Sequence, residues 1–87
     1  MKKRFADLRT EQIFETRFAK GVTAKVSVPG HKTLRLLVAS RSLQDVGVIG
    51  QIAELSDSRY GLYVYGKWSV TFEWIGDQAR EIKLQRT

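Results

Sequence analysis

Hydrophobic and polar residues alternate along the second half of the chain with the two-residue period of a β-strand. The longest run covers residues 67–75. Its apolar face is formed by Trp68, Val70, Phe72 and Trp74, and its polar face by Ser69, Thr71 and Glu73. Residues 60–65 and 80–85 show the same period, with Leu62, Val64, Ile82 and Leu84 inward. Because Gly66-Lys67 and Gly76-Asp77 supply tight turns, the pattern predicts an antiparallel three-stranded meander.

The first half of the chain follows the 3.6-residue period of a helix in two places. Residues 2–6 predict a short first strand. Asp7 or Thr10 can then cap a helix that runs to about Phe18, because both are favoured N-cap residue types. Gly21 is the expected stop of this helix, since glycine readily adopts the left-handed backbone conformation that ends helices.

Ser27 is the expected cap of a second helix, with Pro29 in its first turn. The Val-Ser-Val run before Pro29 fits an extended chain equally well. The spacing predicts an apolar face on this helix, formed by Leu34, Leu37 and Val38. A neighbouring basic face is formed by His31, Lys32 and Arg35. Leu36 lies outside both groups, which predicts a helix buried on two sides.

The order of these elements predicts an α+β fold in which two N-terminal helices pack on a twisted antiparallel β-sheet. The length of 87 residues allows one domain, residues 1–87, and a domain of this size needs an efficient core. For residues 52–55 the pattern fits either a short strand or an irregular segment. The composition supplies the core, because 43% of the residues are hydrophobic.

The residue types that are missing exclude several kinds of site. The chain has no cysteine and a single histidine, His31, which excludes disulfides, thiolate metal sites and multi-histidine metal sites. No apolar run reaches membrane-spanning length, and the basic N-terminus lacks the apolar stretch of a secretory signal. We therefore expect a cytoplasmic protein with no metal, no small-molecule cofactor and no membrane association.

The formal net charge of +6 arises from one segment of the chain. Residues 16–44 contain no acidic residue and six basic ones: Arg17, Lys20, Lys25, Lys32, Arg35 and Arg41. The rest of the chain carries nine basic and nine acidic residues and is balanced. Such a field predicts a polyanionic partner such as a nucleic acid, or an acidic protein.

Residues 59–74, with the sequence RYGLYVYGKWSVTFEW, resemble the signature hairpin of the HigB-type toxins (plasmid maintenance killer proteins) of the RelE/ParE superfamily. In that hairpin a strand of the form R-Y-S-I-x-I is followed by a turn and W-R-[IV]-x-F-x-[WF]. Residues 34–46 (LRLLVASRSLQDV) resemble the family's L-x-x-L-x-x-A-x-x-L-x-D-L helix end, and residues 14–16 resemble its early F-E-T segment.

The resemblance implies a RelE/ParE-like fold and a toxin of a type II toxin–antitoxin system. Active members cleave mRNA on the ribosome, so the implied partners are the ribosome, mRNA and a helix-turn-helix antitoxin of the HigA type. In the implied chemistry an RNA 2′-hydroxyl attacks the adjacent phosphate while protein groups move protons and stabilise charge. This reaction requires no cofactor.

The sequence departs from the family at three places that usually supply catalytic groups. The family's arginine follows the signature tryptophan, but here Ser69 stands there and cannot make a bidentate charged contact. The family's final D-Y-H is absent from residues 83–87, and the loop 50–58 carries Glu54 and Asp57 instead of lysine or histidine.

Other groups would then have to serve. The candidate catalytic residues are Lys67, Ser69, Lys83 and Arg86, and the candidate RNA-binding residues are Arg59, Tyr63, Tyr65, Lys32 and Arg35. Strand alternation predicts that Arg59, Tyr63, Tyr65 and Lys67 share the face opposite Leu62 and Val64, where rings can stack on bases and cations can meet phosphates. Alternation likewise predicts that Lys83 shares the face of Glu81.

Three other interpretations remain open. The protein can be a ParE-like toxin, a class that acts on DNA gyrase through surface contacts without a ribonuclease site. It can also be a degenerate toxin that only binds its antitoxin, or a plain nucleic-acid-binding module. The same residues have structural explanations too: Tyr63 and Tyr65 favour strands, Lys67 suits a solvated turn, and Glu73 and Glu81 suit ion pairs with Lys or Arg.

Overall fold

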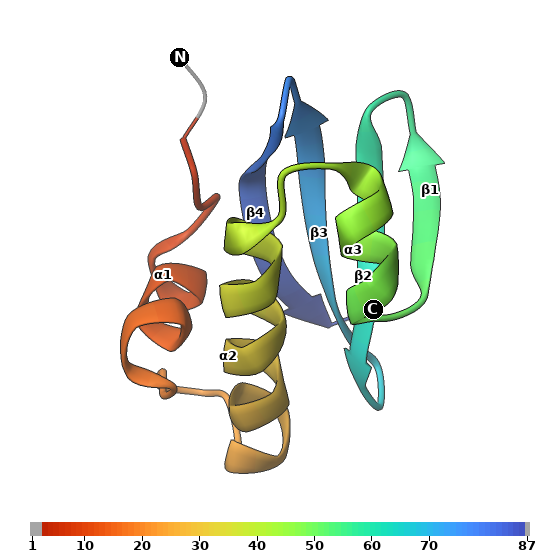
Figure 1. Cartoon of the computed structure of the whole chain (residues 1–87). Coiled ribbons are helices and arrows are strands. Elements are labelled where there is room, and N and C mark those ends of the chain that lie inside the picture. The colour runs from red at the N-terminus through yellow and green to blue at the C-terminus, as the bar shows by residue number, and fades with distance from the viewer. Residues whose placement is uncertain (1–2, 87) are drawn as a thin grey trace.

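A computed structural model describes residues 3–86 of the protein. Three helices precede a four-stranded antiparallel sheet with the strand order β1-β2-β3-β4 (Figure 1). The elements are α1 (Leu8–Thr16), α2 (Ala24–Ala39), α3 (Leu43–Ile49), β1 (Ile52–Ser56), β2 (Arg59–Tyr65), β3 (Trp68–Ile75) and β4 (Gln78–Arg86). The predicted α+β class and the antiparallel meander are therefore confirmed. The third helix was not predicted, and residues 52–55 belong to a strand.

Of the two candidate caps for α1, Asp7 is the one used. Its Oδ1 accepts a hydrogen bond from the Thr10 N–H at 2.9 Å, which satisfies an orphan donor of the first turn. Thr10 is buried, and its hydroxyl accepts a hydrogen bond from the Leu84 N–H at 2.9 Å. The helix ends at Thr16 rather than at Phe18, because Arg17 already adopts a left-handed conformation with φ 75°.

The prediction that Ser27 caps α2 is wrong, because the helix begins at Ala24 after Thr23. Val26 belongs to the core, so its burial stabilises an additional first turn. Ser27 is buried within the helix and its Oγ has no hydrogen-bond partner among the described residues. Pro29 consequently lies in the helix interior, where it removes one backbone hydrogen bond. Leu36 is 43% exposed, so the predicted burial on two sides is also wrong.

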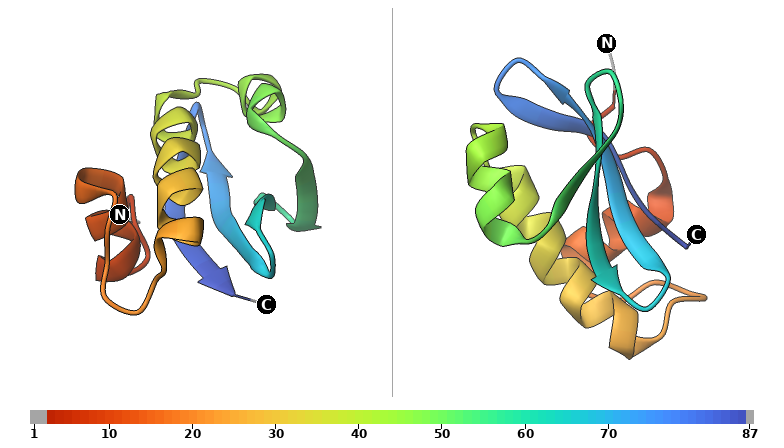
Figure 2. Two further views of the ribbon diagram at one scale, coloured as in Figure 1. Left: turned by 90° about the horizontal axis from the view of Figure 1, so that it is seen from below. Right: turned by 90° about the vertical axis from the view of Figure 1, so that its right-hand side faces the viewer.

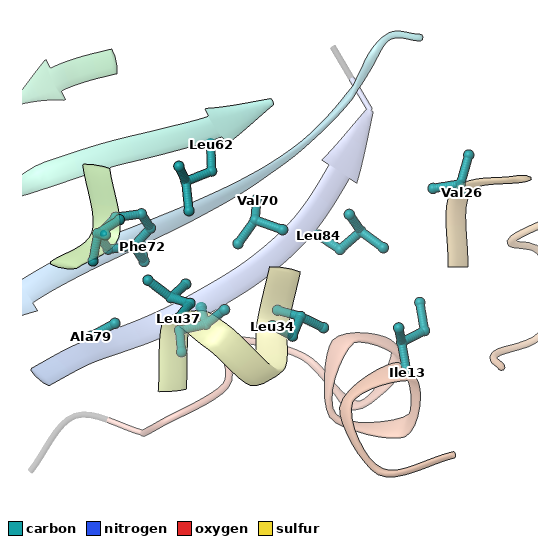
Figure 3. Close-up of a cluster of buried hydrophobic side chains, with 11 residues drawn as sticks. Ile13, Val26, Leu34, Leu37, Leu62, Val70, Phe72, Ala79 and Leu84 are labelled. Atoms are coloured by element: carbon teal, nitrogen blue, oxygen red, sulfur yellow. The ribbon is translucent and has the colours of Figure 1, made fainter. Parts of the chain in front are cut away.

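The apolar face predicted for α2 packs on one face of the sheet. Leu34 and Leu37 are fully buried and meet Leu62, Val70, Phe72 and Leu84 from the strands (Figure 3). Trp68 and Trp74 flank this cluster as partly buried side chains. The inward positions predicted for β2, β3 and β4 therefore form the core.

The N-terminal segment closes the outer edge of β4. The Ile82 N–H donates to the Arg4 carbonyl at 3.0 Å, and the Ala6 N–H donates to the Ile82 carbonyl at 2.8 Å. Phe5 forms an isolated parallel bridge to Ile82, so the predicted first strand exists as a short pairing; Lys2 lies outside the described residues. A β-bulge at Glu81, with φ 51°, returns Ile82 to the core face after Ala79.

Candidate functional site

The sheet has one face covered by helices and one open face. Helices α2 and α3 both lie on the same side of the strands (Figure 2). The side chains directed away from them form three rows across the sheet, because paired residues of antiparallel strands share a face. The rows are Arg59–Glu73–Arg80, then Ala53–Gly61–Thr71–Lys83, then Tyr63–Ser69–Gln85.

A groove of about 430 Å³ runs over the second and third rows. Its lining residues come from the segment before β1 and from all four strands: Gln51, Ala53, Leu55, Gly61, Tyr63, Ser69, Thr71 and Gln85. Gly61 and Thr71 are buried, and Thr71 is only 5% exposed. Small or short side chains at the centre of the face therefore leave room that larger neighbours surround.

The rim of the groove is aromatic and apolar. Tyr63 is 64% exposed and Leu55 is 56% exposed. A Cβ atom added at Gly61 would meet Leu55 Cδ1 at 3.6 Å, which shows that the leucine side chain lies above the glycine. An exposed ring beside a small-residue floor is an arrangement on which a flat aromatic ligand can stack.

Ser69 lies opposite Tyr63 in the groove, at the position where the resemblance expects an arginine. Thr71 supplies a second hydroxyl, and Gln85 supplies an amide. Lys83 is the cross-strand partner of Thr71, so this cation belongs to the row that crosses the groove. Together these groups offer neutral hydrogen bonds with one cation beside them.

The predicted common face holds for Arg59 and Tyr63 but not for Tyr65. A register shift between Tyr63 and Tyr65 pairs Tyr65 with Trp68, a residue that packs against the core. The extra residue of a β-bulge reverses the alternation beyond it. Arg86 also pairs with Trp68 and so lies outside the three rows of the open face.

Two further candidate cations are placed differently from the prediction. Lys67 is exposed in the β2–β3 turn, where it belongs to no strand face and does not line the groove. Lys83 is separated from Glu81 by the bulge, and Arg80 rather than Glu81 is the cross-strand partner of Glu73. The sequence pattern did not reveal that Arg80 pairs with Glu73, because the prediction rested on an unbroken alternation along β4.

The first row of the open face is a charged cluster. Arg59 Nη1 lies 3.9 Å from Glu73 Oε2, with side-chain exposures of 39% and 18%. Arg80 faces Glu73 from the other side, so one carboxylate stands between two arginines. The structural explanation that Glu73 pairs with an arginine is thus confirmed. The role of Arg80 was missed, although its place in the β4 run was the available signal.

Lys32 and Arg35 lie on a different surface from the groove. They border a hollow on α2 together with Arg17, Val28, His31 and Leu36. The Arg35 guanidinium stands 4.3 Å from the centre of the Phe14 ring, and His31 Nδ1 lies 2.8 Å from the Ile13 carbonyl oxygen. Since α2 packs its other side on the covered face, the nine candidate residues do not form a single site.

Within residues 3–86, no three His, Asp or Glu side chains gather as potential metal ligands. Over the same residues, no helix has both the length and the apolar composition needed to cross a membrane. Comparison of the sequence with models of protein families finds no match, and comparison with curated proteins finds none either.

Proposed function

We propose that this protein is a HigB-type toxin of a type II toxin–antitoxin system that binds mRNA on its open face and cleaves it on the ribosome. The main support is the position of the outward residues of the hairpin that resembles the family. Gly61, Tyr63, Ser69 and Thr71 all line one groove, and Arg59 and Glu73 form the adjacent row. A hairpin with a purely structural role needs apolar residues on its covered face, but it does not need a groove on its open face.

Single-stranded RNA suits the shape and chemistry of the groove. A base can stack on the exposed Tyr63 ring, and such stacking contributes about 1–3 kcal/mol per base in single-strand binders. The hydroxyls of Ser69 and Thr71 and the amide of Gln85 can hydrogen-bond base edges or a 2′-hydroxyl. Lys83 can then neutralise a phosphate at the edge of the groove.

For cleavage we assign the proton transfers to Glu73 and Lys83. They lie in adjacent rows of the open face on the neighbouring strands β3 and β4, with the bulge at Glu81 between their cross-strand pairs. The Glu73 carboxylate takes the proton of the 2′-hydroxyl as its oxygen bonds to phosphorus. The bond from phosphorus to the 5′-oxygen breaks, and the Lys83 ammonium protonates that oxygen, leaving a 2′,3′-cyclic phosphate and a 5′-hydroxyl.

Arg59 takes over part of the role that the missing arginine has in the family. It lies in the same row as Glu73, so its guanidinium can contact the phosphate whose neighbouring hydroxyl is deprotonated. This proposal includes a RelE/ParE-like fold, a cytoplasmic location with the ribosome, and a helix-turn-helix antitoxin of the HigA type as partner. The basic surface of α2 that carries Lys32 and Arg35 would contact ribosomal RNA.

One observation favours a second candidate function. Among residues 3–86, the side chains that line the groove are all uncharged. A groove of this composition suits binding without cleavage, as in a gyrase-directed ParE-like toxin or a member that only binds its antitoxin. The two candidates differ in whether the charged row and Lys83 take part in chemistry.

In vitro translation with the purified protein, followed by mapping of mRNA 5′ ends, tests the proposal. We expect new ends within codons on the ribosome, and a cleavage rate that falls by about 10²-fold or more in Lys83→Ala and Glu73→Gln. Lys20→Ala, which removes an exposed charge from the α1–α2 loop, is the control and should cleave at the wild-type rate. Unimpaired translation with intact mRNA would reject the ribonuclease and leave the second candidate.

A further inference from the structure

A polar cavity lies away from the open-face groove, where three distant parts of the chain meet. It is lined by Arg4 from the N-terminal segment, by Asp77 from the β3–β4 turn and Gln78 at the start of β4, and by Val38, Ser40 and Arg41 at and just after the end of α2. These parts all lie in the upper half of Figure 1, while the α1–α2 loop lies at the bottom. The cavity has a volume of about 320 Å³, room for about ten water molecules.

Arg4 is held in a fixed position at this cavity. Its Nη1 donates to Gln78 Oε1 at 2.8 Å, and its Nη2 donates to the Val38 carbonyl at 2.9 Å. The backbone is fixed as well, because the Arg4 carbonyl accepts from the Ile82 N–H at 3.0 Å. A guanidinium has five N–H groups, so donors remain after these contacts. One of them, the Nε–H, is buried without a partner among the described residues.

Among the described residues, neither arginine side chain at the cavity forms an ion pair, although the Arg41 backbone N–H donates to Asp45 Oδ2 at 3.2 Å. No carboxylate within residues 3–86 lies within 4.0 Å of the Arg4 guanidinium or of the Arg41 guanidinium. Burial lowers the pKa of Arg4, and the charge of Arg80 lowers that pKa further. Among the described residues that line the cavity, Asp77 is the one acidic residue, and the lining also contains two arginines.

We propose that this cavity binds a phosphate group through the guanidinium groups of Arg4 and Arg41. The planar fork of arginine matches phosphate oxygens, and two such groups suit a ligand with more charge than a carboxylate. The Gln78 side chain, already oriented by its bond to Arg4, can donate its amide hydrogens to the same ligand. The site does not depend on the proposed ribonuclease activity, since none of its residues lies in the groove.

The test is a titration of the full chain with inorganic phosphate, followed by NMR of backbone amides at constant ionic strength. We expect shifts to concentrate at Arg4, Ser40, Arg41, Asp77 and Gln78. Arg41→Ala, which changes an exposed side chain, should weaken binding about tenfold, as loss of a charged hydrogen bond does. Asp77→Asn should tighten binding about twofold, because it removes a nearby negative charge.

Arg17→Ala is the matched control, since it removes an exposed arginine that follows the last turn of α1 and does not line the cavity, and it should leave the affinity within twofold. A titration with the dinucleotide UpU separates two sources of the phosphate. Competition between UpU and phosphate for the same amides identifies an RNA backbone as ligand, and binding of inorganic phosphate alone identifies a small free phosphate. Absence of localised shifts, or an equal loss in Arg17→Ala, would overturn the site.

Discussion

The two faces of the sheet are built from the same strands but differ in what their side chains do. On the covered face Leu62, Val70 and Phe72 are buried against α2. On the open face the residues between them in sequence, such as Tyr63 and Ser69, border a groove. One hairpin thus supplies both stability and a surface for binding, and substitutions on its two faces should separate these properties.

The two edges of the sheet show a related difference. The edge of β4 is closed, because residues 3–6 pair with it and the Thr10 hydroxyl and the Arg9 guanidinium bond the Leu84 backbone. The β1 edge has exposed residues from Ala53 to Ser56. Open edges pair readily with other chains unless they are short or interrupted, and β1 is both short and shifted in register near Ser56. The β4 edge is therefore protected by other parts of the chain, whereas the β1 edge relies on its short length and irregular register.

The largest effect is expected for Leu37→Ala on the covered face. Leu37 is fully buried between α2 and the strands, and such truncations reduce the free energy of unfolding by about 2–5 kcal/mol. A chain of this length has a total of only about 4–13 kcal/mol, so the variant should be close to unfolding. Urea denaturation followed by circular dichroism measures the change.

Leu55→Ala is the matched control on the open face. Leu55 is more than half exposed, and we expect its truncation to change the free energy of unfolding by no more than about 0.5 kcal/mol. Equal losses in Leu37→Ala and Leu55→Ala would mean that the open face carries packing of its own and would contradict the division between the two faces.

Much of the covered face could be predicted from sequence, because burial imposes a period that the residues display. The inward sets of the meander and the apolar stripe of α2 follow from this period alone. The start of α2 could not be predicted, because burial of Val26 outweighs the capping preference of Ser27 and the position of Pro29. Local propensities are weak relative to such tertiary contacts.

On the open face, the largest effect on binding is expected for Tyr63→Ala. Loss of a stacking ring weakens single-strand RNA binding by about 1–3 kcal/mol, roughly five- to 150-fold, while the fold should remain intact. Fluorescence anisotropy with a labelled single-stranded RNA at low salt measures the affinity. Tyr65→Ala is the matched control, since Tyr65 is also an exposed tyrosine of β2 but pairs with Trp68 and does not line the groove. A larger loss in Tyr65→Ala would place the RNA elsewhere.

The candidate site was harder to predict than the core, and the reason is geometric. Tyr63, Ser69 and Lys83 lie on the open face as alternation predicts, but a β-bulge in β2 shifts Tyr65 away from it, and Arg86 pairs with Trp68 on the other face. A bulge depends on contacts made by the whole sheet and, at Glu81, on pairing with residues 3–6. The cavity at Arg4 joins segments more than seventy residues apart, which no local pattern reveals.

The smallest effect is expected for the Arg59–Glu73 ion pair on the open face. The two charged atoms lie 3.9 Å apart and both side chains are partly exposed, so the pair should contribute about 0.2–1 kcal/mol to stability. A double-mutant cycle with Arg59→Gln and Glu73→Gln isolates this coupling, because interactions of Glu73 with Arg80 cancel in the cycle. At 1 M salt the Debye length is about 3 Å, so the coupling energy should largely disappear. A coupling above about 2 kcal/mol that persists in salt would show that the charged row is desolvated, which would contradict its assignment to an open face accessible to RNA.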